Sequence, residues 1–314
     1  MARTPSTERQ RLGVGGAKLP QEFLEVADGG LVRLIVPDAI IERVAAGFRF
    51  TEGPLWLGDR LLFSDIPNNR TVCWRELPEG PEVTTFRTPT GNANGLTLDR
   101  QGRILRCEHS GRRVSRLEPS GEVVAIAERY QGKRLNSPND VVVRSDGTVY
   151  FTDPPYGLRN QSEGREIPFN GVYKLSPSGD LEALLTDFER PNGLAFSPDE
   201  SVLYVDDTFR HHIRSFPVRT DGTLGEGRVF AELRGVEPGG PDGMKVDVEG
   251  NIWCTGSGGI WVFDASGRKL GRVVFPELPA NLAWGGSDWR TLYVTARTGL
   301  YRLGPLGVAG TPVR

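Results

Sequence analysis

The sequence predicts an all-β protein, a six-bladed β-propeller with four antiparallel strands in each blade, and three observations support this prediction. A pattern of two short apolar strands joined by a turn rich in Asp and Gly recurs six times in the 314 residues. The copies begin 39 to 53 residues apart, which matches the length of one four-stranded blade. Long amphipathic helical patterns are absent, so an alternation of strands and helices is not indicated.

Each copy begins with a polar residue that precedes the first apolar strand. In the first copy the two strands are expected at 52–56 and 61–65, and in later copies turns such as 99–102 and 145–147 separate them. Third and fourth strands are visible at 113–117 and 171–175. The six leading residues all carry a side-chain oxygen: Glu52, Asn94, Asn139, Asn192, Asp242 and Asn281.

The last copy has too few residues after Tyr301 to complete a blade. The apolar segment 39–44 precedes the first copy, and we expect it to supply the outer strand of the sixth blade, which would remove an open sheet edge. The propeller is therefore expected to span 39–314. Residues 1–38 are expected to form an N-terminal arm that is partly disordered.

Composition and charge exclude several classes of function. The formal net charge is −2, so no basic excess directs the chain to nucleic acid or to a membrane surface. Three widely spaced cysteines do not form a disulfide framework, and neither a signal peptide nor a transmembrane run is visible. These features predict a cytoplasmic protein, and we expect it to be a monomer or a homodimer.

The six leading residues predict a shared binding site. Equivalent positions of the innermost strands lie at one height in a propeller, so these side chains are expected to form a ring. Asn-Gly and Asp-Gly are also common turns, but Glu52 is not a turn residue and Asn139 is followed by Asp140. Carboxylate and amide oxygens suit Ca²⁺ or Mg²⁺. The three histidines and three cysteines are scattered and do not favour a zinc site.

Four motifs carry a resemblance to a known family: FTEGPLW at 50–56, NSPND at 136–140, RPNGL at 190–194 and GPDGM at 240–244. Together they resemble the gluconolactonase, senescence-marker-protein (regucalcin) and luciferin-regenerating-enzyme family, most of all its bacterial gluconolactonases. The resemblance extends from about residue 40 to 303. It implies one divalent cation at the channel mouth, Ca²⁺ with Zn²⁺, Mn²⁺ or Mg²⁺ as alternatives, held by Glu52, Asn139, Asn192 and Asp242.

The activity that the resemblance implies is the hydrolysis of a sugar lactone such as gluconolactone. The cation would polarise the lactone carbonyl as a Lewis acid, and a water would attack the carbonyl carbon. Three residues remain open as the general base. Asp242 is the family's usual candidate, Asp140 adjoins a ligand, and His109 ends a strand and is expected to titrate in a useful range.

Substrate contacts follow less directly from the resemblance. In the animal members an arginine two residues before the first ligand asparagine binds sugar, but Ser137 stands at that place here. Arg134 or Asn136 could substitute for it. The remaining candidates for hydrogen bonds to the substrate are Glu108, Tyr156, Asn94 and Asn281.

Two alternative functions stay open at this point. One is a metal-dependent phosphotriesterase or another lactonase on the same scaffold, and the other is a non-enzymatic calcium-binding propeller. A serine esterase is not supported, because no Gly-x-Ser-x-Gly motif occurs.

Overall fold

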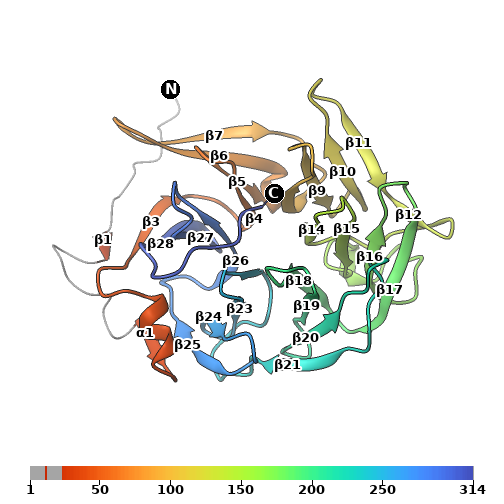
Figure 1. Cartoon of the computed structure of the whole chain (residues 1–314). Helices are drawn as coiled ribbons and strands as arrows, with labels where there is room; N and C mark the ends of the chain where they lie inside the picture. Colours follow the sequence, from red (N-terminus) through yellow and green to blue (C-terminus); the bar gives the residue numbers. More distant parts are fainter. Residues whose placement is uncertain (1–10, 13–22, 314) are drawn as a thin grey trace.

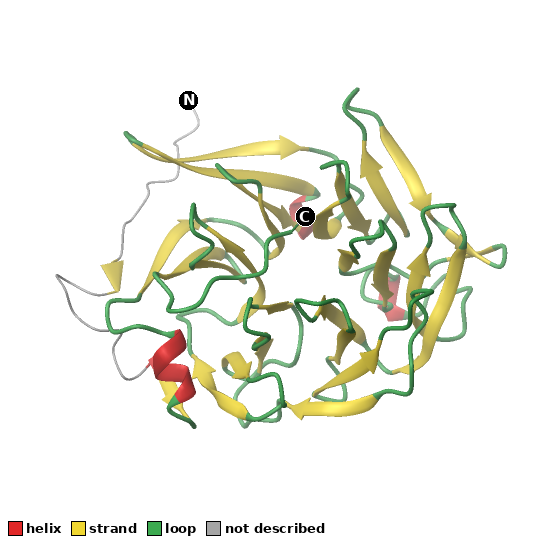
Figure 2. Cartoon of the chain, in the orientation of Figure 1, coloured by secondary structure: helices red, strands yellow, loops and turns green. Residues whose placement is uncertain are grey.

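The computed structural model describes residues 11–12 and 23–313 of the chain. Six small antiparallel sheets surround a common axis, and the described residues contain a single short α-helix (Figures 1 and 2). The predicted six-bladed propeller is therefore confirmed. No helix within the described ranges is both long and apolar enough to cross a bilayer.

The first three blades follow one another along the chain, each running from the axis outward. Blade 1 contains β4 (Thr51–Trp56), β5 (Leu61–Asp65), β6 (Arg70–Leu77) and β7 (Gly80–Arg87). Blade 2 contains β8 (Ala93–Leu98), β9 (Ile104–Glu108), β10 (Arg113–Leu117) and β11 (Val123–Ala127). Blade 3 contains β14 (Val141–Val143), β15 (Val149–Asp153), β16 (Asn170–Leu175) and β17 (Leu181–Phe188).

The last three blades complete the ring. Blade 4 contains β18 (Pro191–Phe196), β19 (Val202–Asp207), β20 (His212–Pro217) and β21 (Arg228–Glu232). Blade 5 contains β22 (Met244–Val246), β23 (Ile252–Gly256), β24 (Gly259–Phe263) and β25 (Lys269–Val273). Blade 6 contains β26 (Pro279–Gly285), β27 (Thr291–Ala296), β28 (Gly299–Gly304) and β3 (Ile40–Ala46).

The N-terminal strand closes the ring as the sequence predicted. β3 pairs antiparallel with β28, with Ile41 opposite Leu303 and Ala45 opposite Leu300. Because β4 follows β3 directly in the chain, the last blade is completed by the segment that leads into the first. This closure leaves the outer edge of β28 paired.

The residues before β3 pack on the propeller more extensively than the expected arm. β1 (Arg11–Leu12) pairs with β3, and β2 (Leu24–Val26) adds a fifth strand to blade 5 beside β25. The helix α1 (Gly30–Leu34) buries Leu31 and Leu34 in the core cluster that joins blades 5 and 6. Residues 1–10 and 13–22 of this segment lie outside the described residues, so the partial disorder expected within 1–38 stays a prediction.

Two short 3₁₀ helices and one hairpin lie between the blade strands. They are η2 (Ile66–Asn68), η3 (Arg159–Gln161) and the pair β12 (Arg129–Tyr130) and β13 (Lys133–Arg134). The sequence did not predict any of them, because each interrupts the repeat instead of belonging to it.

Large aromatic side chains fill the spaces between adjacent blades. Trp253 of blade 5 meets Trp284 of blade 6 edge to face, with ring centroids 5.4 Å apart. Trp56 of blade 1 stacks on Tyr293 of blade 6 at 5.1 Å. These contacts fix the inclination of neighbouring blades, and with it the position of the innermost strands.

Candidate metal centre and adjoining pocket

The six leading residues stand at the inner end of each blade, where the backbones of neighbouring blades approach closely. A Cβ atom on Gly53 would lie 2.0 Å from the carbonyl oxygen of Asn94, and one on Gly193 would lie 2.1 Å from that of Asp242. Gly53 also has a φ of +50°, whereas Gly193 is not in the left-handed region. At Gly193, glycine is therefore required by the close approach of the next blade and not by a turn.

Hydroxyl groups on the second strands hold the leading residues in register. Ser64 donates to the carbonyl of Asn94 in the next blade at 2.7 Å, and Thr152 donates to that of Asn192 at 2.8 Å. Both hydroxyls are fully buried. Asn94 and Asn192 are thus fixed by the blade before each of them, which limits how far their side chains can move.

Glu52 and Asp242 bring two carboxyl groups together. Glu52 is almost fully buried and its Oε2 accepts hydrogen bonds from the Gly53 N–H at 2.6 Å and from Asn281 Nδ2 at 2.9 Å. Loss of solvation, followed by the charge of Asp140, raises the pKa of Glu52 to about 7. Loss of solvation and the neighbouring Glu52 carboxyl raise the pKa of Asp242 well above its ordinary value.

Amide oxygens from two other blades face the same ring. Asn192 donates through Nδ2 to Thr208 Oγ1 at 3.0 Å, which turns its Oδ1 to the opposite side. Asn139 accepts at Oδ1 from Asn94 Nδ2 at 2.5 Å and keeps its second lone pair. Both residues are about 95% buried, so their amide oxygens have few alternative partners.

These residues fit a divalent cation. Burial raises the pKa of both carboxyl groups, and the Glu52 carboxyl raises that of Asp242 further, so a hard cation bound by oxygen would stabilise their charged forms. Within the described residues no three His, Cys, Asp or Glu side chains gather as a metal cluster. The predicted ligand set contains two carboxylates and two amides, so the site would bind a cation through mixed carboxylate and amide oxygens.

The candidate bases differ in their surroundings. Asp140 accepts at Oδ1 from the Val141 N–H at 2.9 Å, while its buried Oδ2 has no hydrogen-bond partner among the described residues. Lys245 Nζ lies 4.0 Å from that oxygen. Burial raises the pKa of Asp140 and the charge of Lys245 lowers it.

His109 is in a different state from the one expected. Its Nε2 lies 3.3 Å from Asn94 Nδ2, and burial lowers the pKa of the imidazole to about 4. The expectation that His109 titrates near neutral pH is therefore wrong, because desolvation disfavours the charged ring. The imidazole is neutral at pH 7 and can accept the hydrogen bond from Asn94.

Asp206 departs from the pattern of the second strands. In four other blades the residue before the last one of the second strand carries a hydroxyl: Ser64, Thr152, Thr255 and Thr295. In blade 4 the same position is Asp206. Asp206 is fully buried, its Oδ1 has no partner among the described residues, and burial raises its pKa well above the ordinary value. Asp207 instead caps its loop by accepting backbone N–H groups from Glu189 and Phe209.

Two predicted substrate contacts are occupied by structural interactions. The carboxylate of Glu108 accepts from Arg106 at 3.2 Å and from Arg113 at 2.7 Å. Asn136 is fully buried and donates through Nδ2 to the carbonyls of Asp153 and Phe169. Both side chains hold strands together instead of facing the ring.

The other predicted substrate contacts lie in three different places. Arg134 lies on the β12–β13 hairpin, where its backbone N–H donates to Glu166. Asn94 and Asn281 belong to the ring itself, bonded to Asn139 and Glu52. Tyr156 lines a pocket, and burial raises the pKa of its phenol, with a further contribution from the charge of Asp242.

Comparison with known proteins assigns the family. Residues 50–298, more than half of the chain, match the SMP-30/Gluconolactonase/LRE-like region. The chain belongs to the SMP-30/gluconolactonase/LRE-like family. The resemblance carried by the four motifs is therefore confirmed.

Three relatives illustrate the place of the chain within the SMP-30/gluconolactonase family. It is 34% identical to the gluconolactonase of Zymomonas mobilis, covering 84% of this chain and 80% of the relative. It is 35% identical to the 6-deoxy-6-sulfogluconolactonase of Pseudomonas putida, covering 78% and 82%. The solved structure of a gluconolactonase from Xanthomonas campestris matches with a TM-score of 0.82 at 34% identity, covering 95% and 99%.

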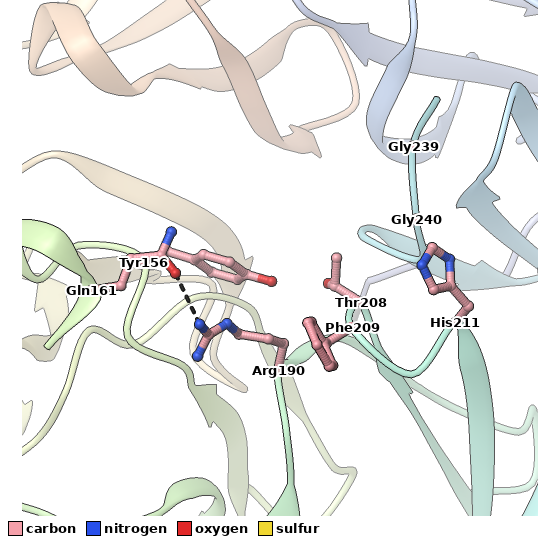
Figure 3. A pocket seen from close by; sticks show the side chains of 8 residues that line it. All are labelled: Tyr156, Gln161, Arg190, Thr208, Phe209, His211, Gly239 and Gly240. Carbon is pink, nitrogen blue, oxygen red and sulfur yellow. Dashed lines mark hydrogen bonds between the residues drawn. The ribbon is translucent and has the colours of Figure 1, made fainter. Parts of the chain in front are cut away.

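Sequence reasoning missed the pocket that adjoins the candidate site of this family member. Figure 3 shows Tyr156, Arg190, Thr208 and His211 around it. Arg190 lies within the RPNGL motif, in which only the neighbouring Asn192 is predicted as a ligand. Thr208 and His211 lie in the loop that joins β19 to β20 within blade 4. The signal in the sequence for this loop was a pair of histidines after a strand end.

Proposed function

We propose that the chain is a divalent-cation-dependent lactonase that opens a sugar lactone, with Glu52, Asn139, Asn192 and Asp242 as the cation ligands. The observation that carries this proposal is the pair of buried carboxyls at the inner end of the ring: burial raises the pKa of both Glu52 and Asp242, and the Glu52 carboxyl raises that of Asp242 further. Family membership and the relatives named gluconolactonase support the substrate class. Oxygen ligands favour Ca²⁺ over softer ions.

A divalent cation held by these side chains supplies Lewis-acid polarisation of the lactone carbonyl. The chain itself orients the ligands. Thr208 fixes the amide of Asn192, and Asn281 fixes the carboxylate of Glu52. Holding the ligands through buried partners reduces the reorganisation that substrate binding would otherwise require.

Asp140 is the residue that we propose as the proton acceptor for the attacking water. Its Oδ2 is buried without a hydrogen-bond partner among the described residues, and Lys245 favours its charged form. Asp242, by contrast, would be occupied as a ligand, which lowers its proton affinity. His109 is neutral and weakly basic, so its role is to accept the hydrogen bond from Asn94.

The test of cation dependence is hydrolysis of glucono-1,5-lactone, followed with a pH indicator. We expect treatment with a chelator to abolish the activity and Ca²⁺, Zn²⁺, Mn²⁺ or Mg²⁺, added back singly, to restore it to different degrees. Full activity in the chelated protein would refute the cation requirement. No activity on any lactone, together with retained Ca²⁺ binding in calorimetry, would favour the non-enzymatic propeller.

Two isosteric variants distinguish the role of Asp242 as a proposed cation ligand from the role of Asp140 as the proposed general base. We expect Asp242→Asn to weaken Ca²⁺ binding and activity together. We expect Asp140→Asn to leave Ca²⁺ binding within about threefold while kcat falls by about 10²–10⁴-fold, the range for general base catalysis. Unchanged kcat in Asp140→Asn would exclude Asp140 as the base. Phosphotriesters and acyl-homoserine lactones, assayed alongside, test the other hydrolases of this scaffold.

A further inference from the structure

The pocket beside the candidate metal centre is lined by cationic and hydrogen-bond-donating groups. It has a volume of about 350 Å³, which is within the range of small-molecule sites. Tyr156 and Arg190 form one wall, and Thr208, Phe209 and His211 form the other (Figure 3). No Asp or Glu side chain lines it among the described residues.

The pocket and the proposed metal centre share their walls. Arg190 lies two residues before Asn192, and Gly240 lies two residues before Asp242. Thr208 connects the two sites directly, since its Oγ1 accepts from Asn192 Nδ2 at 3.0 Å and donates to the Pro241 carbonyl at 2.7 Å. A ligand bound at Asn192 and Asp242 would therefore extend into this pocket.

Arg190 brings a positive charge that no carboxylate neutralises. Its Nη2 donates to Gln161 Oε1 at 3.0 Å (Figure 3), and it forms no salt bridge with any described Asp or Glu. Two other arginines have their charge neutralised: Arg272 and Arg302 each form salt bridges with two glutamates. Gln161 thus holds the guanidinium in place without compensating its charge.

Two further polar groups in the pocket lack partners. Tyr156 Oη and His211 Nδ1 are buried and meet no hydrogen-bond geometry within the described part of the chain, although the Thr208 side chain lies beside the phenol. A buried polar group without a partner is costly, which indicates that a ligand or water satisfies it. The guanidinium and the Tyr156 hydroxyl present donors to one volume, His211 Nδ1 adds a donor in the tautomer that carries its proton there, and the ring of Phe209, 66% exposed, adds an apolar rim.

We propose that this pocket binds an oxyanion substituent of the substrate, a phosphate, sulfonate or carboxylate at the end of the lactone remote from the carbonyl that is hydrolysed. A planar guanidinium binds such a group through two parallel hydrogen bonds, and the Tyr156 hydroxyl and His211 ring provide further contacts. This inference rests on the proposed lactonase function. It assigns Arg190 as a specificity-determining residue and the substrate class as anionic sugar lactones.

The kinetic test compares 6-phospho-glucono-1,5-lactone with glucono-1,5-lactone. We expect the wild-type protein to show the higher kcat/KM for the phosphorylated lactone. In Arg190→Gln that kcat/KM should fall at least about tenfold more than the value for the neutral lactone, because a hydrogen bond to a charged group is lost. Arg190→Lys, which keeps the charge but not the planar fork, should lie between the two.

A matched control removes charge nearby without entering the pocket. Arg159, on η3 beside Gln161, is 81% exposed at its side chain and lies 3.6 Å from Glu163. We expect Arg159→Gln to change the preference between the two lactones by less than about twofold, since exposed charges are screened. An equal loss of preference in Arg159→Gln and Arg190→Gln would overturn the assignment, since it would indicate a general effect of net charge.

A binding measurement separates this inference from the proposed function. Calorimetry with 6-phosphogluconate and gluconate should show tighter binding of the phosphorylated acid, and the difference should disappear in Arg190→Gln. Glucarate distinguishes a carboxylate from a phosphate at the same position. If no lactone is hydrolysed but this difference is found, the lactonase proposal fails and the pocket assignment stands. If lactones are hydrolysed and Arg190→Gln affects charged and neutral ligands alike, the pocket assignment is refuted.

Discussion

At the scale of single residues, two buried acids of the second strands differ in the partners that their carboxylates have. Asp65 and Asp153 occupy equivalent strand ends, yet their environments differ. Asp65 is paired with Arg70 at 3.0 Å and accepts further hydrogen bonds. Asp153 accepts the Asn136 N–H at 2.7 Å, but its Oδ1 has no partner among the described residues.

Asp153 therefore predicts a pH dependence of stability. Loss of solvation raises the pKa of Asp153 to about 7, so the folded state keeps the proton over a range where the unfolded state has released it. Stability should consequently fall as the pH rises from about 4 to about 7, with a slope of at most about 1.4 kcal/mol per pH unit from this group. Asp153→Asn should remove this contribution.

The measurement is urea unfolding of both proteins between pH 4 and pH 8 at one Ca²⁺ concentration. The difference in unfolding free energy between wild type and variant isolates Asp153, because the other titrating groups are common to both. We expect the variant to gain relative stability as the pH rises towards 7. A difference that is constant across this range would contradict the raised pKa.

At the scale of elements, adjacent blades are linked by hydroxyl groups on the second strands, which donate to backbone carbonyls at the innermost strand of the next blade. Thr152 on β15 donates to the Asn192 carbonyl on β18 and accepts the Asp140 N–H at 3.1 Å. Its hydroxyl thus connects a proposed base and a proposed cation ligand. Secondary-structure patterns locate the strand but not this connection, which exists only once two blades are side by side.

Thr152→Val should lower the unfolding free energy by about 1–3 kcal/mol, because it leaves the Asn192 carbonyl and the Asp140 N–H unpaired in a buried site. Ca²⁺ affinity should fall with it, since Asn192 loses its support. Thr71→Val is the matched control: Thr71 is equally buried, but its hydroxyl has no partner among the described residues. That change should be neutral or slightly stabilising. A comparable loss in both variants would show that shape, and not hydrogen bonding, is responsible.

At the scale of the whole molecule, the sequence predicted what repeats and missed what does not. The ring, its closing strand and the six leading residues follow from one pattern that recurs in every blade. The pocket at Arg190 and His211 does not, because loops between strands differ from blade to blade and meet only in the folded ring. Residue type alone suggested Glu108 and Asn136 for sugar binding, but it could not show that arginines hydrogen-bond Glu108 or that backbone carbonyls accept from the Asn136 amide.

Closure of the ring by β3 predicts that the propeller unfolds as one unit. Ile41 is 1% exposed and packs in the core cluster with residues of blades 5 and 6. Ile41→Ala should therefore lower the free energy of unfolding by about 2–5 kcal/mol. The loss should appear as a shift of a single cooperative urea transition, because an opened sixth blade leaves both of its neighbours without a packing surface.

The control for this prediction is Val32→Ala, a truncation on the exposed side of α1, where Val32 is 52% exposed. It should change the unfolding free energy by less than about 0.5 kcal/mol. If Ile41→Ala instead produced a separate unfolding transition at lower urea concentration while the main transition stayed in place, the prediction would be contradicted. The strand β3 would then unfold independently of a propeller that is stable without it. Tryptophan fluorescence can distinguish the two outcomes, because Trp253 and Trp284 lie in the same core cluster as Ile41 and report directly on the junction of blades 5 and 6.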